Sequence, residues 1–288
     1  MTQNPPKFDP IKYKQTTLQQ WNSAAEAWCR WGPLLSRWLG PATETMFDLC
    51  GITSGSRVLD VAAGAGEQTL AVAKRTGATG HVLATDLSPV ILDYVTQDAR
   101  LNGFQHVNTQ VIDGEKLDEM DTGPFDAVIS RVGLIYFPDQ QKALRGMYQQ
   151  LKIGGKVAAM VYASADDNPF FSIPVSIIRK RAQLPPPLPG QPGPFSLGSA
   201  TVLEKAFSDA GFRDIEIVSV DAPLRLSSAS ECIQFEQESF GALHQMMSSL
   251  TDAEQDDAWQ EIEQSLSQFE SDGRFEGPCK MLIAVGSR

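Results

Sequence analysis

The sequence predicts an α/β protein built on a Rossmann-like, doubly wound sheet of seven strands, to which helical caps are added. Strand-like and helix-like segments alternate from Arg57 to Tyr162, which is typical of a parallel sheet covered by helices on both faces. A glycine turn, Gly64-Ala65-Gly66, lies between the first apolar run and the helix that follows it. Long segments outside the alternation predict the caps, because loops of such length in a compact domain usually serve as covers.

The individual elements follow from hydrophobic periodicity and from turn residues. The first five predicted strands are 58–63, 81–85, 106–112, 125–130 and 156–162, and the intervening helices are 68–75, 89–102 and 140–151. Gly154-Gly155 marks the expected turn before the fifth strand. A helix over 201–210 is closed by Gly211, and the sixth and seventh strands are predicted over 213–220 and 280–285.

The segments between and around these elements divide the chain into six units. The first segment carries Trp21, Trp28, Trp31 and Trp38 in a helical pattern, so we expect it to be a cap. In chain order the predicted units are an N-terminal helical cap (1–50), the cofactor-binding core (51–165), a Pro-rich loop or cover (166–200), a core helix and strand (201–222), a helical cap insertion (223–275) and the terminal core strand (276–288).

Composition indicates a soluble cytoplasmic enzyme. Of the 288 residues 42% are hydrophobic and 20% are charged, as in ordinary globular proteins. The formal net charge of −11 argues against nucleic acids and anionic membranes as partners, since these select basic surfaces. The 4 cysteines are scattered, so neither a metal site nor a disulfide framework is predicted. No signal peptide and no run of membrane-spanning length is recognisable, and the oligomeric state cannot be predicted.

The glycine turn and a distant acid together predict a cofactor that contains a nucleoside. Asp86 ends the second predicted strand about 20 residues past Gly66, the spacing at which an acid reaches a ribose hydroxyl. The alternative is an ordinary strand–helix turn in which Asp86 only caps the next helix. A dinucleotide fingerprint has a third small residue near the position of Thr69. Asp60 and Glu67 also bring negative charge to the turn, which suits a cationic ligand such as S-adenosylmethionine better than a phosphate.

Five motifs occur in the order found in one enzyme family. The chain resembles the class I S-adenosylmethionine-dependent methyltransferases, and within them the ubiquinone/menaquinone-biosynthesis C-methyltransferases. The motifs are Val58-Leu59-Asp60-Val61-Ala62-Ala63-Gly64-Ala65-Gly66, Asp86-Leu87-Ser88-Pro89, Asp113-Gly114-Glu115, Phe125-Asp126-Ala127-Val128 and Leu151-Lys152-Ile153-Gly154-Gly155. The resemblance implies that the last of the seven strands is reversed and that S-adenosylhomocysteine is the product.

The resemblance also assigns roles around the first strand and the glycine turn. Ala62, Gly64 and Gly66 would lie against the cofactor, with the two glycines beneath it. Asp60 would help to hold the amino end of S-adenosylmethionine, directly or through water. The structural alternative is that Asp60 only caps the turn.

Further roles concern the adenosine. Asp86 would accept both ribose hydroxyls, and Leu87 would pack on the adenine. Asp113 would accept from the exocyclic amine of adenine, while the Gly114 N–H meets the ring. Asp113 could instead form an Asx-turn with Gly114 and have no ligand.

The methionine end of the cofactor is less well defined by the sequence. Ser130 and Arg131 would border both the methionine and the substrate, although Arg131 could equally pair with a surface carboxylate. In many relatives a Tyr-Asp pair on an N-terminal helix reaches the cofactor carboxylate. Here the corresponding dipeptide is Trp21-Asn22, so either Trp21 only packs or another group, such as Arg30 or Arg37, takes over.

The acceptor is expected to be a small, largely apolar molecule methylated on oxygen, carbon or nitrogen. His244 and Tyr136 are the candidates for substrate-facing catalytic side chains, together with Arg131. Their structural alternatives are a solvated helix histidine and a core tyrosine. Two other classes of function fit the same residues: a nucleotide-dependent oxidoreductase, and a protein that binds S-adenosylmethionine without catalysis.

Overall fold

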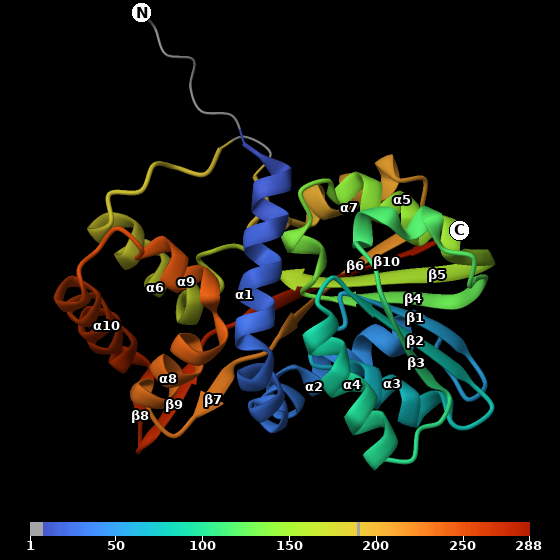
Figure 1. Ribbon diagram of the computed structural model, residues 1–288, viewed down its shortest axis with the longest axis horizontal. Coiled ribbons are helices and arrows are strands. Elements are labelled where there is room, and N and C mark those ends of the chain that lie inside the picture. The colour runs from blue at the N-terminus through green and yellow to red at the C-terminus, as the bar shows by residue number, and fades with distance from the viewer. Residues whose placement is uncertain (1–7, 189–190) are drawn as a thin grey trace, which may run out of the picture.

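The computed structural model describes residues 8–188 and 191–288 and is centred on a seven-stranded sheet (Figure 1). The strand order is β3-β2-β1-β4-β5-β10-β6, and β10 runs antiparallel to both of its neighbours. The strands are β1 (Arg57–Val61), β2 (His81–Asp86), β3 (Val107–Val111), β4 (Phe125–Arg131), β5 (Leu151–Tyr162), β6 (Arg213–Asp221) and β10 (Lys280–Ser287). The predicted α/β sheet with a reversed last strand is confirmed.

Helices cover both faces of the sheet, as Figure 1 shows. One face carries α2 (Gly32–Leu49), α3 (Glu67–Thr76) and α4 (Pro89–Leu101). The other carries α5 (Gln140–Gln150), α7 (Ala200–Asp209) and the short 3₁₀ helix η1 (Gly114–Glu119). The central strands are therefore apolar on both sides, with Val58, Val128 and Val157 fully buried. This rigid arrangement fixes the loops at the carboxyl ends of the strands, where sites form in such sheets.

The caps lie beside these loops. The long helix α1 (Pro10–Arg30) stands between the sheet and a group of further helices (Figure 1). That group contains α6 (Pro169–Arg181), α8 (Ala229–Ser239), α9 (Gly241–Met246) and α10 (Asp252–Leu266). A small sheet of order β7-β9-β8 lies below them and is formed by β7 (Leu224–Leu226), β8 (Glu270–Ser271) and β9 (Arg274–Gly277). Two more 3₁₀ turns are η2 (Leu134–Tyr136) and η3 (Ser267–Phe269).

The connection expected over 166–200 differs from the prediction, because it contains the helix α6. Pro174 lies inside this helix, and an internal proline argues against a helix in the sequence. Phe170, Pro174 and Ile178 are nevertheless buried at a helical spacing of four residues. The Pro-rich stretch that follows includes residues 189–190, which lie outside the described part, as do residues 1–7 of the predicted N-terminal cap. The expected turn at Gly154-Gly155 is instead an irregularity within β5, where the pairing with β4 shifts register.

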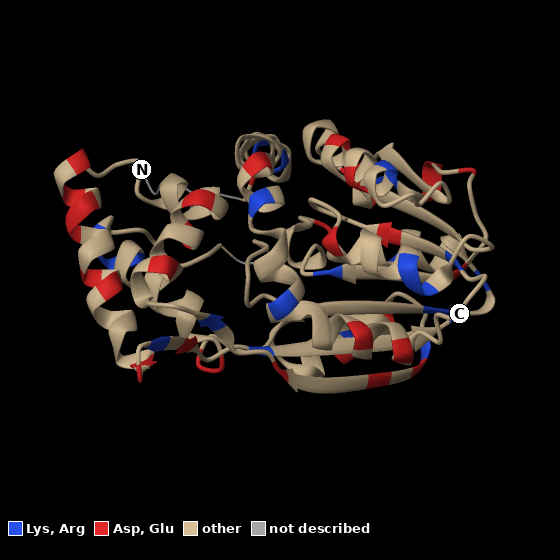
Figure 2. Ribbon diagram, turned by 90° about the horizontal axis from the view of Figure 1, so that it is seen from below, with Lys and Arg blue, Asp and Glu red and all other residues tan. Residues whose placement is uncertain are grey.

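Negative charge is concentrated on the outermost cap helix. In Figure 2 several stretches of the ribbon of α10, at the left, have the red colour of acidic residues, and the sequence of this helix contains six Asp or Glu residues and no Lys or Arg. This face is therefore unfavourable for contact with a polyanion such as a nucleic acid. Within the described ranges, no helix combines the length and apolar character that crossing a membrane requires.

Candidate cofactor and acceptor site

The glycine turn leaves β1 and enters α3 through two residues with positive φ. Gly64 has φ +56° and Gly66 has φ +89°, which favours glycine at both positions. A Cβ atom on Gly66 would lie 2.7 Å from Val95 Cγ2, so this residue lets α4 approach closely. A Cβ atom on Gly64 would meet no heavy atom within 4 Å. Gly64 therefore forms an open floor on which a ligand can lie.

Asp86 at the end of β2 fixes this turn. Its Oδ2 accepts the Gly64 N–H at 3.0 Å, and its Oδ1 accepts the Ser88 N–H at 2.9 Å. Burial raises the pKa of Asp86, and the backbone N–H groups of Ser88, Gly64 and Leu87 oppose that rise. An ionised carboxylate has about four acceptor positions, so two backbone bonds leave room for ribose hydroxyls.

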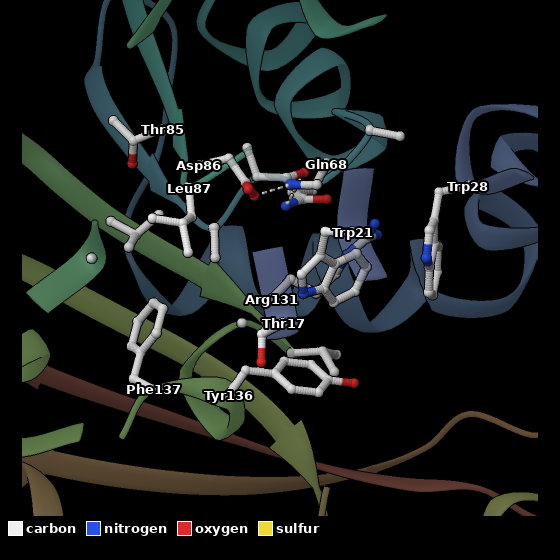
Figure 3. A pocket seen from close by; sticks show the side chains of 18 of the residues that line it. Thr17, Trp21, Trp28, Gln68, Thr85, Asp86, Leu87, Arg131, Tyr136 and Phe137 are labelled. Atoms are coloured by element: carbon white, nitrogen blue, oxygen red, sulfur yellow. Dashed lines mark hydrogen bonds between the residues drawn. The ribbon is translucent and has the colours of Figure 1, made fainter. Parts of the chain in front are cut away.

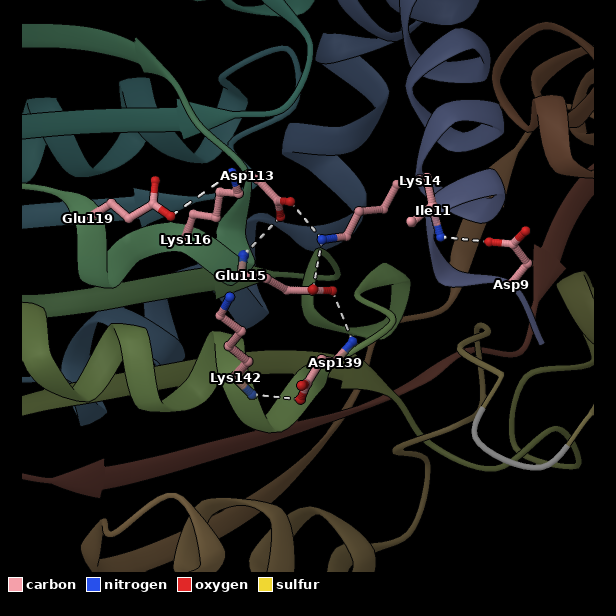
Figure 4. Close-up of polar contacts among 9 residues, drawn as sticks. All are labelled: Asp9, Ile11, Lys14, Asp113, Glu115, Lys116, Glu119, Asp139 and Lys142. Atoms are coloured by element: carbon pink, nitrogen blue, oxygen red, sulfur yellow. Dashed lines mark hydrogen bonds and ion pairs between the residues drawn. The ribbon is translucent and has the colours of Figure 1, made fainter. Parts of the chain in front are cut away.

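Lys14 ties the cap helix α1 to the loop after β3 (Figure 4). Its Nζ lies 2.6 Å from Asp113 Oδ2 and 2.7 Å from Glu115 Oε2. Asp113 Oδ1 also accepts the Glu115 N–H at 3.0 Å, and Glu115 Oε1 accepts the Asp139 N–H at 2.9 Å. The carboxylate expected to meet adenine is thus also the group that holds the cap helix in place.

We expect Lys14→Met to loosen the N-terminal part of α1, because two partly buried ion pairs of up to about 1 kcal/mol each are lost. Amide hydrogen exchange measures this directly: the first turns of α1 should exchange several-fold faster. Lys12→Met is the matched control, because Lys12 is exposed on the same helix. Equal exchange rates in the two variants would show that the ion pairs do not hold the helix.

A pocket lies between the strand ends and α1 (Figure 3). One side consists of the glycine turn and the loops that carry Asp86 and Asp113. The other side is aromatic, and Figure 3 shows Trp21 next to Tyr136, with ring centroids 5.5 Å apart. The aromatic lining residues are Trp21, Trp28, Trp38, Tyr136, Phe137, Tyr162 and Phe240. The pocket therefore has a polar half suited to a nucleoside and an apolar half suited to a hydrophobic molecule.

Two residues that line the pocket have backbone conformations uncommon for their type. Ala62 has φ 57° and Val132 has φ 62°, each directly after a central strand. A left-handed conformation in a β-branched residue such as Val132 is strained, and residues of this kind concentrate at ligand sites. Gly133 is next to Val132, and a Cβ there would lie 2.4 Å from Ala62 Cβ. The residues that follow β1 and β4 are therefore in close contact at the wall of the pocket.

Most of the residues selected from the sequence meet in this pocket. Its lining includes Ala62, Gly64, Gly66, Asp86, Leu87, Asp113, Gly114, Arg131 and Tyr136. Asp60 and Ser130 are fully buried and do not belong to the lining. Asp60 lies behind the pocket, where Oδ2 accepts from the Thr69 hydroxyl at 2.6 Å and Oδ1 accepts from the Gln68 amide at 3.3 Å. Gln68 does line the pocket, so Asp60 helps to position a pocket residue without reaching the pocket itself.

Burial raises the pKa of Asp60 to about 6, and the hydrogen bonds from Thr69 and Gln68 only partly oppose this. The unfolded chain releases this proton near pH 4, so the folded state holds more protons between about pH 4 and 6. This group therefore makes stability fall as pH rises through that window, by roughly 3 kcal/mol.

We expect Asp60→Asn to remove this contribution. Chemical denaturation at pH 4.5 and 7.5 should show that the variant loses less stability on the change to pH 7.5 than the wild type does. Comparing the two proteins cancels the effects of the other carboxyl groups. If the wild type and the variant show the same change in stability between the two pH values, Asp60 ionises normally in the folded protein.

The structure does not bring His244 to the site. This residue is exposed on α9, and its Nε2 lies 2.7 Å from the Gln237 carbonyl oxygen. The expectation that it faces the acceptor is therefore corrected: the helical cap turns it outward, where it contacts the Trp259 ring. Tyr136 is the aromatic candidate that does face the pocket, and burial raises its pKa, so its hydroxyl stays protonated.

Several lining residues have no clear signal in the sequence. Lys14 and Thr17 come from α1, Tyr162 from the end of β5, and Phe240 from the cap. Each is distant in sequence from the glycine turn, and only tertiary packing brings them together at the pocket. Tyr162 could have been selected, since it ends a central strand, where sites form in such sheets.

The model of the ubiE/COQ5 methyltransferase family matches residues 42–181 of this chain. These residues, just under half of the chain, are therefore similar to that family, and they include the glycine turn and the strands β1 to β5. Among curated proteins, the ubiquinone/menaquinone biosynthesis C-methyltransferase of Idiomarina loihiensis is 33% identical over 117 residues, which cover 40% of this chain and 46% of that protein. The chain spans about half the length of the curated relatives that it matches.

Solved structures share this fold over most of the chain. The YcgJ protein of Bacillus subtilis has a TM-score of 0.56 at 17% identity and covers 86% of this chain and 98% of its own. Phosphoethanolamine N-methyltransferase 2 of Haemonchus contortus, solved with S-adenosyl-L-methionine, has a TM-score of 0.53 at 18% identity, covering 86% of this chain and 52% of its own. At such identities the likeness shows the shared fold alone.

Proposed function

We propose that this protein transfers a methyl group from S-adenosylmethionine to a small, largely apolar organic acceptor. One observation carries the proposal: the open glycine floor, Asp86 and Asp113 line the same pocket as a wall of seven aromatic side chains. The residues fit the cofactor, because the floor has free space and two carboxylates face it. The aromatic half supports an apolar acceptor next to it.

The role of the chain is to align the two reactants and to exclude water. S-adenosylmethionine supplies an activated methyl group when it is bound. Transfer is an in-line displacement, so correct alignment can account for much of the acceleration. The helix α1 covers the pocket, and Trp21 and Trp28 on it keep the acceptor side apolar.

Two tyrosines provide polar groups within the aromatic wall. Burial raises the pKa of both Tyr136 and Tyr162, so both hydroxyls are neutral at physiological pH. Neither makes a hydrogen bond to another described residue, although Trp28 and Trp38 in the same wall donate to the carbonyls of Ser239 and Ala222. These hydroxyls are available to orient an acceptor whose reacting atom is oxygen, nitrogen or carbon.

Methyl transfer is tested with S-adenosylmethionine that carries a labelled methyl group and a panel of phenols, quinols and amines. Mass spectrometry of ligands that co-purify with the protein selects the first acceptors for the panel. We expect label in an apolar acceptor together with release of S-adenosylhomocysteine. Binding of S-adenosylhomocysteine without turnover on any acceptor would favour the non-catalytic alternative, and hydride transfer with a nicotinamide cofactor would favour the oxidoreductase.

A further inference from the structure

Arg131 ends β4 and lines the pocket (Figure 3). Only part of its guanidinium group is engaged by other residues that the structure describes. Its side chain is 6% exposed, and Nη1 forms an ion pair with Glu67 Oε2. Nη1 also donates to Thr43 Oγ1 at 3.1 Å. Nε and Nη2 make no hydrogen bond to any residue that the structure describes. These two atoms form one edge of the planar guanidinium, which matches both oxygens of a carboxylate.

Glu67 supplies the opposite charge at the same place. It is the first residue of α3 directly after Gly66, it lines the pocket, and its side chain is 13% exposed. Its Oε2 is used by Arg131, whereas Oε1 accepts no hydrogen bond from the described residues. Arg131 thus keeps Nε and Nη2, and Glu67 keeps Oε1, available for a ligand in the pocket. A ligand with a carboxylate beside an ammonium group is complementary to that pair.

The other basic residues considered for the cofactor carboxylate lie outside the pocket or are paired with acids. Arg30 is 53% exposed and pairs with Glu238, and Arg37 is exposed and does not line the pocket. Lys14 lines the pocket but pairs with the two acids of the loop after β3. Asn22, in the position of the relatives' acid, accepts the Ser88 hydroxyl at 2.6 Å.

We propose that Arg131 and Glu67 form the binding site for the amino-acid end of the cofactor. The Nε and Nη2 edge of Arg131 receives the α-carboxylate, and Glu67 Oε1 receives the α-ammonium. This proposal rests on the proposed function. In the free protein each charge compensates the other, which avoids the cost of a lone buried ion. Thr43 is a positioning residue, because its hydroxyl donates to the Leu39 carbonyl at 2.8 Å and so presents a lone pair to Arg131.

The test compares two ligands by titration calorimetry. S-adenosylhomocysteine has the amino-acid end, whereas 5′-methylthioadenosine keeps the adenosine and the sulfur but lacks it. We expect Arg131→Gln to weaken binding of S-adenosylhomocysteine at least about ten-fold, since a charge-assisted bidentate contact is lost. Binding of 5′-methylthioadenosine should stay within about two-fold of the wild type, because it never used that contact. Arg30→Gln, outside the pocket, should change neither affinity.

Two results would overturn the proposal. If Arg131→Gln lowers the affinities for both ligands by the same factor, Arg131 supports the shape of the pocket instead of binding the amino acid. If it weakens neither, the carboxylate is held elsewhere. Failure of the wild-type protein to bind either ligand would contradict the proposed function itself, so the two failures are distinguishable.

A second variant protects the test against misfolding. Arg131→Gln leaves Glu67 as a buried charge without its partner, which can destabilise the fold. The double variant Glu67→Gln with Arg131→Gln removes both charges and avoids that cost. It should bind the two ligands with nearly equal affinity, and circular dichroism checks that it is folded. A preference for S-adenosylhomocysteine as large as that of the wild type would overturn the proposal.

Discussion

Gly64→Val is expected to abolish binding of S-adenosylhomocysteine, with a loss of at least about a hundred-fold in affinity, since a side chain then fills the ligand's space. The backbone at Gly64 has φ +56°, and its Cβ position opens into the pocket with no heavy atom within 4 Å. Valine is β-branched and cannot turn away from that space without further strain. Titration calorimetry measures the loss of affinity.

Gly103→Val is the matched control for this substitution. Gly103 has φ +73° and also meets no heavy atom within 4 Å of its Cβ position, yet it lies outside the pocket. Both variants should lose about 1–3 kcal/mol of unfolding free energy, the usual cost of a left-handed conformation in a residue other than glycine. Only Gly64→Val should lose the ligand. Normal binding by Gly64→Val would show that the turn is not the cofactor floor.

Asp86→Ala should weaken binding of S-adenosylhomocysteine more than ten-fold, because a hydrogen bond from a ribose hydroxyl to a carboxylate contributes about 1.5–3 kcal/mol. The structure adds a second consequence, since the N–H groups of Gly64 and Ser88 also lose their acceptor. The melting temperature should therefore fall together with the affinity. Calorimetry and thermal denaturation measure the two effects.

The control for Asp86→Ala is Asp126→Ala at the opposite end of the strands. Asp126 Oδ2 also accepts a backbone N–H, that of Arg57 at 2.7 Å, but it is outside the pocket. The control should lower stability and leave the affinity for S-adenosylhomocysteine unchanged. If both variants lose the ligand to the same degree, the effect of Asp86 is one of folding and not of contact.

The sheet and the polar half of the pocket could be predicted from the sequence because their signals are local. A glycine turn after an apolar run and Asp86 at the next strand end fix both position and chemistry within about 30 residues. The alternation of strands and helices in turn predicts a parallel sheet covered by helices on both faces. Asp113, which also lines the pocket, was predicted from the family resemblance and not from these local signals.

The acceptor half could not be predicted, because residues distant in sequence form it. Trp21 on α1 and Tyr136 on η2 meet only through tertiary packing, and no periodicity encodes that contact. Glu67 and Arg131 pair across 64 positions. His244 was selected because it is a histidine in a cap, and the cap turns it outward. The strands β7 and β8, of 3 and 2 residues, are too short for any alternation to be recognised.

The most direct measurement is a calorimetric titration of the wild-type protein with S-adenosylhomocysteine and, separately, with NAD. The open floor at Gly64, the carboxylates of Asp86 and Asp113, and the pairing of Glu67 with Arg131 predict one saturable site for S-adenosylhomocysteine. The acids around the turn predict no measurable heat with NAD, since they oppose its phosphates. Saturable binding of NAD with no binding of S-adenosylhomocysteine would contradict the account.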